Sequence, residues 1–182
     1  TSCANDLIKY LCRDGSSDEM IFDTKDIFEK FYSNIIALTV LGVGTSCDYS
    51  DKSKVHEIAC KINNNLTSFW GSVKILILNH FPSIVKFLPV HIFESSIHEF
   101  FQDHVIDEIK RRERKNIENR RDFLQHVLEM RKESAKSFDW NDGELITAQV
   151  MSFFTAGFST TSTLFQASCY ELAKNAKIQN EM

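Results

Sequence analysis

The sequence predicts a mostly α-helical protein, and three observations support that prediction. Glycine and proline are scarce, with 6 and 2 residues among 182, whereas turn-rich β folds need more of both. Apolar residues recur at the three- and four-residue spacing of a helix face along much of the chain. One stretch, 145–170, then runs for 26 residues without a charged side chain. As a helix rising ~1.5 Å per residue it would form a rod of roughly 39 Å, long enough to cross a whole domain.

Three helices are predicted before residue 70. The first covers 3–14 and the second covers 24–43, where Asp23 and Asp26 mark the start and a broad apolar face follows. A third helix covers 52–69, because its apolar residues fall on one stripe.

The region 68–101 is the most apolar and aromatic part of the chain. It contains both prolines, Pro82 and Pro89, and each should interrupt a helix. Its aromatic residues are too many for a simple solvated loop. They are Phe69, Trp70, Phe81, Phe87, Phe93, Phe100 and Phe101. Two interpretations stay open: a segment that covers the core, or a surface that touches a membrane or roofs a ligand channel, since amphipathic anchors favour such aromatics.

A long helix is predicted over 94–118 and a short one over 121–132. The stretch 107–122 holds seven Lys or Arg against five Asp or Glu. Mixed signs at helical spacing indicate a solvated face whose charges pair with one another. Together with a net charge of −4, this pattern argues against nucleic-acid binding.

The uncharged stretch belongs to a helix predicted over 142–174. Asn141 and Glu144 resemble a capping box at its start. A membrane span is the first alternative, since uncharged runs of ~18 or more residues raise it. However, 11 of the 26 residues in 145–170 are Ser, Thr or Gln, which is too polar for contact with lipid. A buried central helix is the better interpretation.

Helical spacing gives this central helix two different faces. One is expected to pack and carries Val150, Phe153, Phe154, Gly157, Phe158, Leu164 and Phe165. The other is small and mostly hydroxylated and carries Ser152, Thr155, Ala156, Ser159, Thr160 and Thr163. Either a second helix packs tightly on the small face, or a bulky cofactor or substrate lies against it. Thr160 should bond back to the carbonyl of Ala156 and open the helix near Gly157.

The sequence gives little support to disulfide, zinc or di-iron sites. The five cysteines have irregular spacing with no Cys-x-x-Cys pair, which suits reduced thiols facing the cytosol. The six histidines form neither His-Glu-x-x-His nor Glu-x-x-His, so zinc-protease and di-iron sites lack their ligands. No metal ligands are predicted in this chain.

The segment 153–162 resembles the oxygen-binding helix of cytochrome P450 monooxygenases. It reads Phe-Phe-Thr-Ala-Gly-Phe-Ser-Thr-Thr-Ser, and 170–173 reads Tyr-Glu-Leu-Ala; the family pattern is Ala-Gly-x-(Asp or Glu)-Thr-Thr and then Tyr-Glu-Leu. Segments 32–42 and 121–125 resemble the family in the same order. The sequence is most similar to microsomal animal enzymes, especially the family-6-like insect detoxification group. The resemblance implies that 1–182 is an interior fragment of one P450 domain, the helical part of that fold.

The resemblance also implies roles for residues of the central helix. Ala156 and Gly157 would lie over the haem. Thr160 would contact the haem site as well, hydrogen-bonding dioxygen or its water there and assisting protonation. Ser152 and Thr155 would face the substrate.

Ser159 departs from the family pattern because it stands where the family has an acid. A hydroxyl can hold a water but has no charge and no proton reserve, so slower proton delivery and more peroxide leakage are expected of the parent enzyme. The family's cysteine-ligand loop is not among these residues. The haem thiolate would come from outside the chain, and the fragment alone is expected to be inactive.

The family also implies a cellular setting. Its members take electrons from NADPH through a cytochrome reductase and insert one oxygen atom into lipophilic substrates, including xenobiotics. Microsomal members lie at the cytosolic face of the endoplasmic reticulum membrane, where 68–101 would roof the substrate channel and touch lipid. The alternative is a non-catalytic helical interaction module, in which 68–101 is a lipid- or partner-binding surface.

Overall fold

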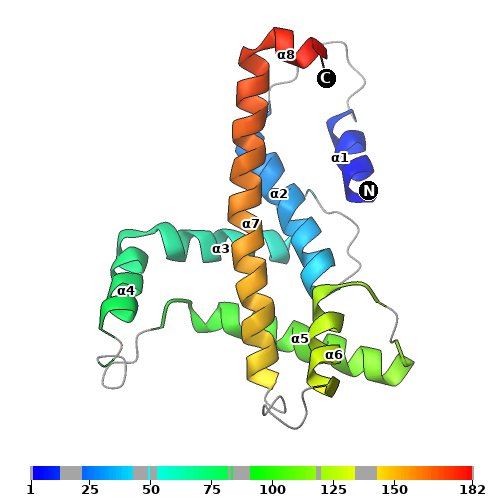
Figure 1. The fold of residues 1–182 in the computed structure, drawn as a ribbon, viewed down its shortest axis with the longest axis vertical. Coiled ribbons are helices and arrows are strands. Elements are labelled where there is room, and N and C mark those ends of the chain that lie inside the picture. The colour runs from blue at the N-terminus through cyan, green and yellow to red at the C-terminus, as the bar shows by residue number, and fades with distance from the viewer. Residues whose placement is uncertain are drawn as a thin grey trace.

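The chain forms a set of helices around one long central rod (Figure 1). The computed structural model describes residues 2–12, 22–42, 49, 53–81, 83, 91–117, 120–133 and 143–181, and none of these forms a strand. The helices are α1 (Ser2–Leu11), α2 (Thr24–Ile36), the π-helix η1 (Ala37–Leu41), α3 (Lys54–Thr67), α4 (Phe69–His80), α5 (Ser95–Lys115), α6 (Phe123–Glu133), α7 (Gly143–Lys174) and α8 (Ala176–Glu181). The mostly α fold predicted from the sequence is confirmed.

The central rod is α7, and α2, α3, α5, α6 and η1 all pack against it. Its Val150, Phe154 and Phe158 are buried in the core. Phe154 meets Phe101 of α5 edge to face, with ring centroids 5.1 Å apart. Full burial of a side chain of this size contributes about 1.5–3 kcal/mol. The uncharged stretch of the sequence therefore organises the fold, as the spacing of its aromatic residues predicts.

Helices occupy all six ranges that the sequence indicates, with slightly different ends. The predicted start of α2 is confirmed, because Asp23 Oδ1 accepts the backbone N–H of Lys25 at 2.9 Å and of Asp26 at 3.4 Å. Such a cap satisfies N–H groups that have no partner within the helix. The predicted capping residue of α7, Asn141, lies outside the described residues.

The aromatic region 68–101 contains a helix, α4, that the sequence analysis did not predict. Ser68 caps it by accepting the backbone N–H of Gly71 at 3.0 Å. The helix ends at His80, just before Pro82. Pro82 and Pro89 are themselves outside the described residues. A helix fits this region because it lies between a serine cap and the first proline.

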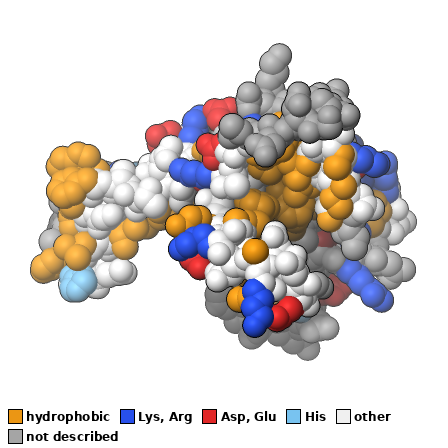
Figure 2. Space-filling view, turned by 90° about the horizontal axis from the view of Figure 1, so that it is seen from above, with side chains coloured by type: hydrophobic (Ala, Val, Ile, Leu, Met, Phe, Trp, Pro, Cys, Tyr) orange, Lys and Arg blue, Asp and Glu red, His pale blue; other side chains and the backbone are white. Residues whose placement is uncertain are grey.

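α3 and α4 form an arm that leaves the body of the molecule (Figure 1). Phe69 and Trp70 at the start of α4 are 74% and 70% exposed, and hydrophobic side chains gather at the far end of the arm (Figure 2). A Cβ on Gly71 would collide with the backbone carbonyl of Asn65, so the corner between the two helices needs a glycine. In the part of the chain that is described, no helix combines the length and the hydropathy that a membrane span requires.

The apolar face predicted for α7 is only partly buried. Phe153, Leu164 and Phe165 are exposed. A packed helix stripe is roughly 100° wide, and Phe153 and Leu164 lie beside the row of Val150, Phe154 and Phe158. The Phe153 ring still contacts that of Phe123 at a tilt of 31°, with ring centroids 3.9 Å apart, and the ring centroids of Phe165 and Tyr32 are 5.1 Å apart.

The charged run 107–122 is not the fully solvated face that the sequence indicated. Glu108 and Arg112 are buried, and the Asp122 side chain is buried beside them. Arg112 Nε donates to Glu108 at 2.8 Å, and its two terminal nitrogens donate to the two carboxylate oxygens of Asp122, each at 2.8 Å. Alternating charges look the same in a solvated face and in a buried network, so spacing alone could not distinguish them.

This buried network closes against the end of η1. Gly42 follows η1 with a φ of +66°, and Arg112 and Asp122 occupy the space that a Cβ would take. Burial alone would raise the pKa of Glu108, but hydrogen bonds from Arg111 and Arg112 outweigh burial and lower it. The network therefore joins α5 to the start of α6 through hydrogen bonds between Arg112 and Asp122, and it lies against the end of η1.

Candidate functional site

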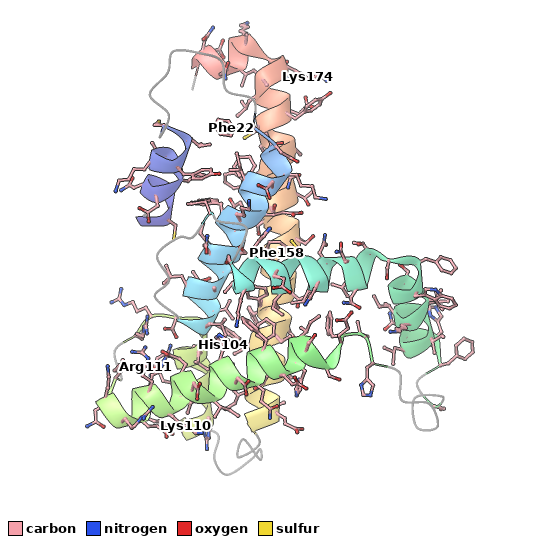
Figure 3. All side chains as sticks on the ribbon, turned by 180° about the vertical axis from the view of Figure 1, so that it is seen from behind. Phe22, His104, Lys110, Arg111, Phe158 and Lys174 are labelled. Atoms are coloured by element: carbon pink, nitrogen blue, oxygen red, sulfur yellow. The ribbon has the colours of Figure 1, made fainter. Side chains whose placement is uncertain are left out.

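The small-residue face of α7 is open in this structure. Ser152, Ala156, Thr160 and Thr163 are all exposed, and they recur at the three- and four-residue spacing of one helix face. The helices that pack on α7 lie on its other side, which the views from front and back both show (Figures 1 and 3). Phe158, labelled in Figure 3 where α3 crosses α7, belongs to that packed side. Nothing in the described residues covers these four side chains, whereas Thr155 and Ser159, the other two members of the predicted small face, are half-buried at its edge.

Thr160 makes the hydrogen bond that the sequence predicts. Its Oγ1 donates to the carbonyl of Ala156 at 2.6 Å. The predicted opening of the helix is wrong, because α7 is continuous α-helix through this point. A carbonyl oxygen has two lone pairs, so that of Ala156 accepts the hydroxyl and a backbone N–H together.

Thr155 differs from the other hydroxyl residues of α7. Thr147, Ser152 and Ser168 each donate to the carbonyl four residues earlier. The Oγ1 of Thr155 is buried and has no hydrogen-bond partner among the described residues. An unpaired buried hydroxyl costs about 1–3 kcal/mol. A polar group beside the open face is thus left without a partner in the part of the chain that the structure describes.

Ser159, which the sequence places on the small face, is hydrogen-bonded to the neighbouring helix α3. Its Oγ donates to Asn63 Oδ1 of α3 at 3.0 Å, and 96 residues separate the two in sequence. The Ser159 side chain is half-buried. Sequence analysis singled out Ser159 but not Asn63, since no local pattern connects residues so far apart.

Gly157 and Ala156 are neighbours in sequence but face different surroundings. A Cβ on Gly157 would lie 2.5 Å from Cδ1 of Ile36 on α2, so this glycine allows α2 and α7 to approach closely. Ala156 is exposed on the small face. The structure therefore places Ser152, Ala156 and Thr160 together, while Gly157 lies towards α2 and Ser159 towards α3.

The open face carries no titratable group, since its side chains are those of Ser, Thr and Ala. Burial, then the charge of Glu29, raises the pKa of the Cys60 thiol on α3. Burial, then the neighbouring Cys169, raises the pKa of Tyr32. Within the described ranges, His, Cys, Asp and Glu side chains form no cluster that could hold a metal ion.

The family model described as "Cytochrome P450" matches residues 1–182. Among curated proteins, the chain is similar to "Cytochrome P450 6a2" of Drosophila melanogaster, with 26% identity over 89% of this chain and 33% of that protein. It is 24% identical to "Cytochrome P450 9c1" of the same species, over 99% of this chain and 36% of the relative. With "Cytochrome P450 9e2" of Blattella germanica it shares 28% identity over 91% of this chain and 33% of that protein. The chain thus spans about a third of the length of these relatives, and the predicted similarity to insect proteins is confirmed.

Proposed function

Because the chain belongs to the cytochrome P450 family, we propose that it is an interior part of a haem-thiolate monooxygenase that acts on lipophilic small molecules. The observation that carries this proposal is the open small-residue face of α7. Ser152, Ala156 and Thr160 are exposed on the side of α7 that its own bundle leaves uncovered.

This face fits haem. Small side chains allow a flat macrocycle to approach the helix closely, and the unpaired hydroxyl of Thr155 lies next to that face. When bound, haem would supply the activation of dioxygen, with a cysteine thiolate from outside this chain as its ligand. Ala156 would leave room for the haem. Gly157 lies towards α2, where it lets the two helices pack closely, so its contribution to the haem site would be to help set the position of α7.

The hydroxyls of α7 would handle protons and substrate. Thr160 already donates its proton to the carbonyl of Ala156, so its oxygen offers lone pairs that can accept a hydrogen bond from a water. Ser159 would assist proton delivery as a hydroxyl without a proton reserve. Ser152 and Thr155 would contact the substrate, with the free hydroxyl of Thr155 available once the side chain turns towards it.

Partners and location follow from the same proposal. Electrons would come from NADPH through a cytochrome reductase. The exposed aromatic side chains of α4, Phe69 and Trp70 among them, would touch lipid at the cytosolic face of the endoplasmic reticulum, beside the entrance for lipophilic substrates such as xenobiotics. Aromatic and aliphatic side chains on one helix favour the lipid interface.

The proposal is tested in the full-length parent by the coupling of NADPH use to product formation. Thr160→Ala should lower coupling, and Ser159→Glu should raise it by supplying the missing acid. Ser168→Ala is the matched control, since Ser168 makes the same kind of back-bond and lies further along α7. Coupling that is unchanged in both test variants would contradict the proposal.

The exposed apolar surface of α4 also supports the second candidate, a non-catalytic helical interaction module. The coding region downstream distinguishes the two. A Phe-x-x-Gly-x-Arg-x-Cys-x-Gly loop there supports the enzyme, and a stop codon soon after residue 182 supports the module.

A further inference from the structure

Asn63 of α3 is connected to the candidate site by a hydrogen bond between side chains. It accepts the Ser159 hydroxyl at 3.0 Å. The backbone carbonyl of Asn63 also accepts a hydrogen bond, from Thr67 Oγ1 at 2.8 Å. Both Asn63 and Ser159 are half-buried, so water competes less for this bond than it would at the surface.

The bond fixes the direction of the Ser159 proton. A serine hydroxyl has one proton and two lone pairs. The Ser159 proton goes to Asn63, and the proton of the neighbouring Thr160 goes to the carbonyl of Ala156. Two adjacent hydroxyls of α7 therefore offer only lone pairs to a third group. A water at either oxygen has to point a proton towards it.

We propose that Asn63 is a positioning residue for proton delivery: by holding the Ser159 hydroxyl as an acceptor, it orients the water that serves Thr160. This role rests on the proposed monooxygenase function. Without Asn63, the Ser159 hydroxyl would rotate to donate to the carbonyl four residues earlier, as serines in helices do. Its oxygen would still accept, but its lone pairs would point in a different direction, so the water would lose its place beside Thr160. Neither residue needs to change its charge for this role.

The test uses the full-length parent with four variants: Asn63→Leu, Asn63→Asp, Ser159→Ala and the double variant Asn63→Leu/Ser159→Ala. Asn63→Leu keeps the size of the side chain and removes the acceptor, so peroxide released per product formed should rise about fivefold, the effect of one net hydrogen bond. Asn63→Asp keeps an acceptor and should stay near wild type. Ser159→Ala should match Asn63→Leu, and the double variant should add nothing further.

A matched control and a readout without turnover complete the design. Asn64→Leu changes the exposed neighbouring residue on α3 and should leave the peroxide ratio unchanged. Hydrogen–deuterium exchange over 54–67 should speed up about fivefold in Asn63→Leu and in Ser159→Ala, and no more in the double variant.

The two proposals fail in different ways. A full-length parent that forms no product overturns the proposed function and the role of Asn63 together. A productive parent whose peroxide ratio is unchanged by Asn63→Leu, or whose double variant shows two independent additive effects, overturns the role of Asn63 alone.

Discussion

Arg112 holds the buried charge network together, so its removal should be one of the most destabilising single changes in this part of the fold. The Arg112 side chain is only 3% exposed, and the side chains of Glu108 and Asp122 are 6% exposed. Arg112→Leu would leave two buried carboxylates facing one another across the space of the lost guanidinium. Breaking a buried ion pair by removing one partner costs about 3–5 kcal/mol.

The remaining partners set where in that range the loss should fall. Guanidinium nitrogens of Arg120 lie 3.2 Å from a carboxylate oxygen of Glu108 and 3.4 Å from one of Asp122. The Nε of Arg111 still pairs with Glu108 Oε2 at 2.6 Å. Both carboxylates therefore keep a cation, which places the expected loss near the lower end, about 3 kcal/mol. Arg112→Lys keeps the charge without the forked geometry and should lose less than Arg112→Leu.

The assay is urea unfolding of the full-length parent, with Arg114→Leu as the matched control. Arg114 lies on the same helix and is exposed, and its Nε donates to the Lys110 carbonyl at 3.2 Å. Its loss should change the free energy of unfolding by less than about 0.5 kcal/mol. Equal stability of Arg112→Leu and Arg114→Leu would refute the reasoning that the network is buried and matters for folding.

Three further variants probe other parts of the structure. The pKa of Glu108 is lowered from its ordinary value of 4.5, so its ionised form stabilises the fold above that value and the stabilisation is lost as the pH falls through the lowered pKa. The stability gap between wild type and Glu108→Gln should therefore close as the pH is brought down below that range, and a gap that is constant with pH argues against it. Gly157→Ala should be nearly neutral alone and stabilising by about 0.5–1 kcal/mol in an Ile36→Val background, which removes the clashing Cδ1; loss of haem in both backgrounds would show that Gly157 faces the cofactor instead. Gly71→Ala should speed amide exchange in α4 but leave exchange in α5 unchanged. Ser72 is exposed, so Ser72→Ala should change exchange in neither helix; equal exchange rates in the two variants would disprove the tight corner.

The helices and the core were predictable because their signals are local. Val150, Phe154 and Phe158 are four residues apart, and that spacing alone places them on one side of a helix. The start of α2 was equally readable, since a capping aspartate acts on backbone groups two and three residues away. The Ser68 cap of α4 was a signal of the same kind, but the two prolines of the same region argue against a helix.

The rest depends on approaches between distant segments. The bond from Ser159 to Asn63 and the pairing of Arg112 with Asp122 exist only because helices cross. Similarly, the direction of Gly157 towards Ile36 follows from how closely α2 and α7 pack. Residue types and spacing within one helix do not determine which other helix it will cross or which side chains will meet there.

The central claim is that the open face of α7 lies against haem, and the ferrous carbon-monoxide difference spectrum of the full-length parent tests it most directly. Three proteins are compared: wild type, Ala156→Trp on the small face, and Ala173→Trp, an exposed position that lies roughly 25 Å further along α7 at ~1.5 Å per residue. Wild type and Ala173→Trp should give the same thiolate–haem band, and Ala156→Trp should lose most of it because the large ring occupies the haem's place. A full band from Ala156→Trp, or none from wild type, would contradict the account.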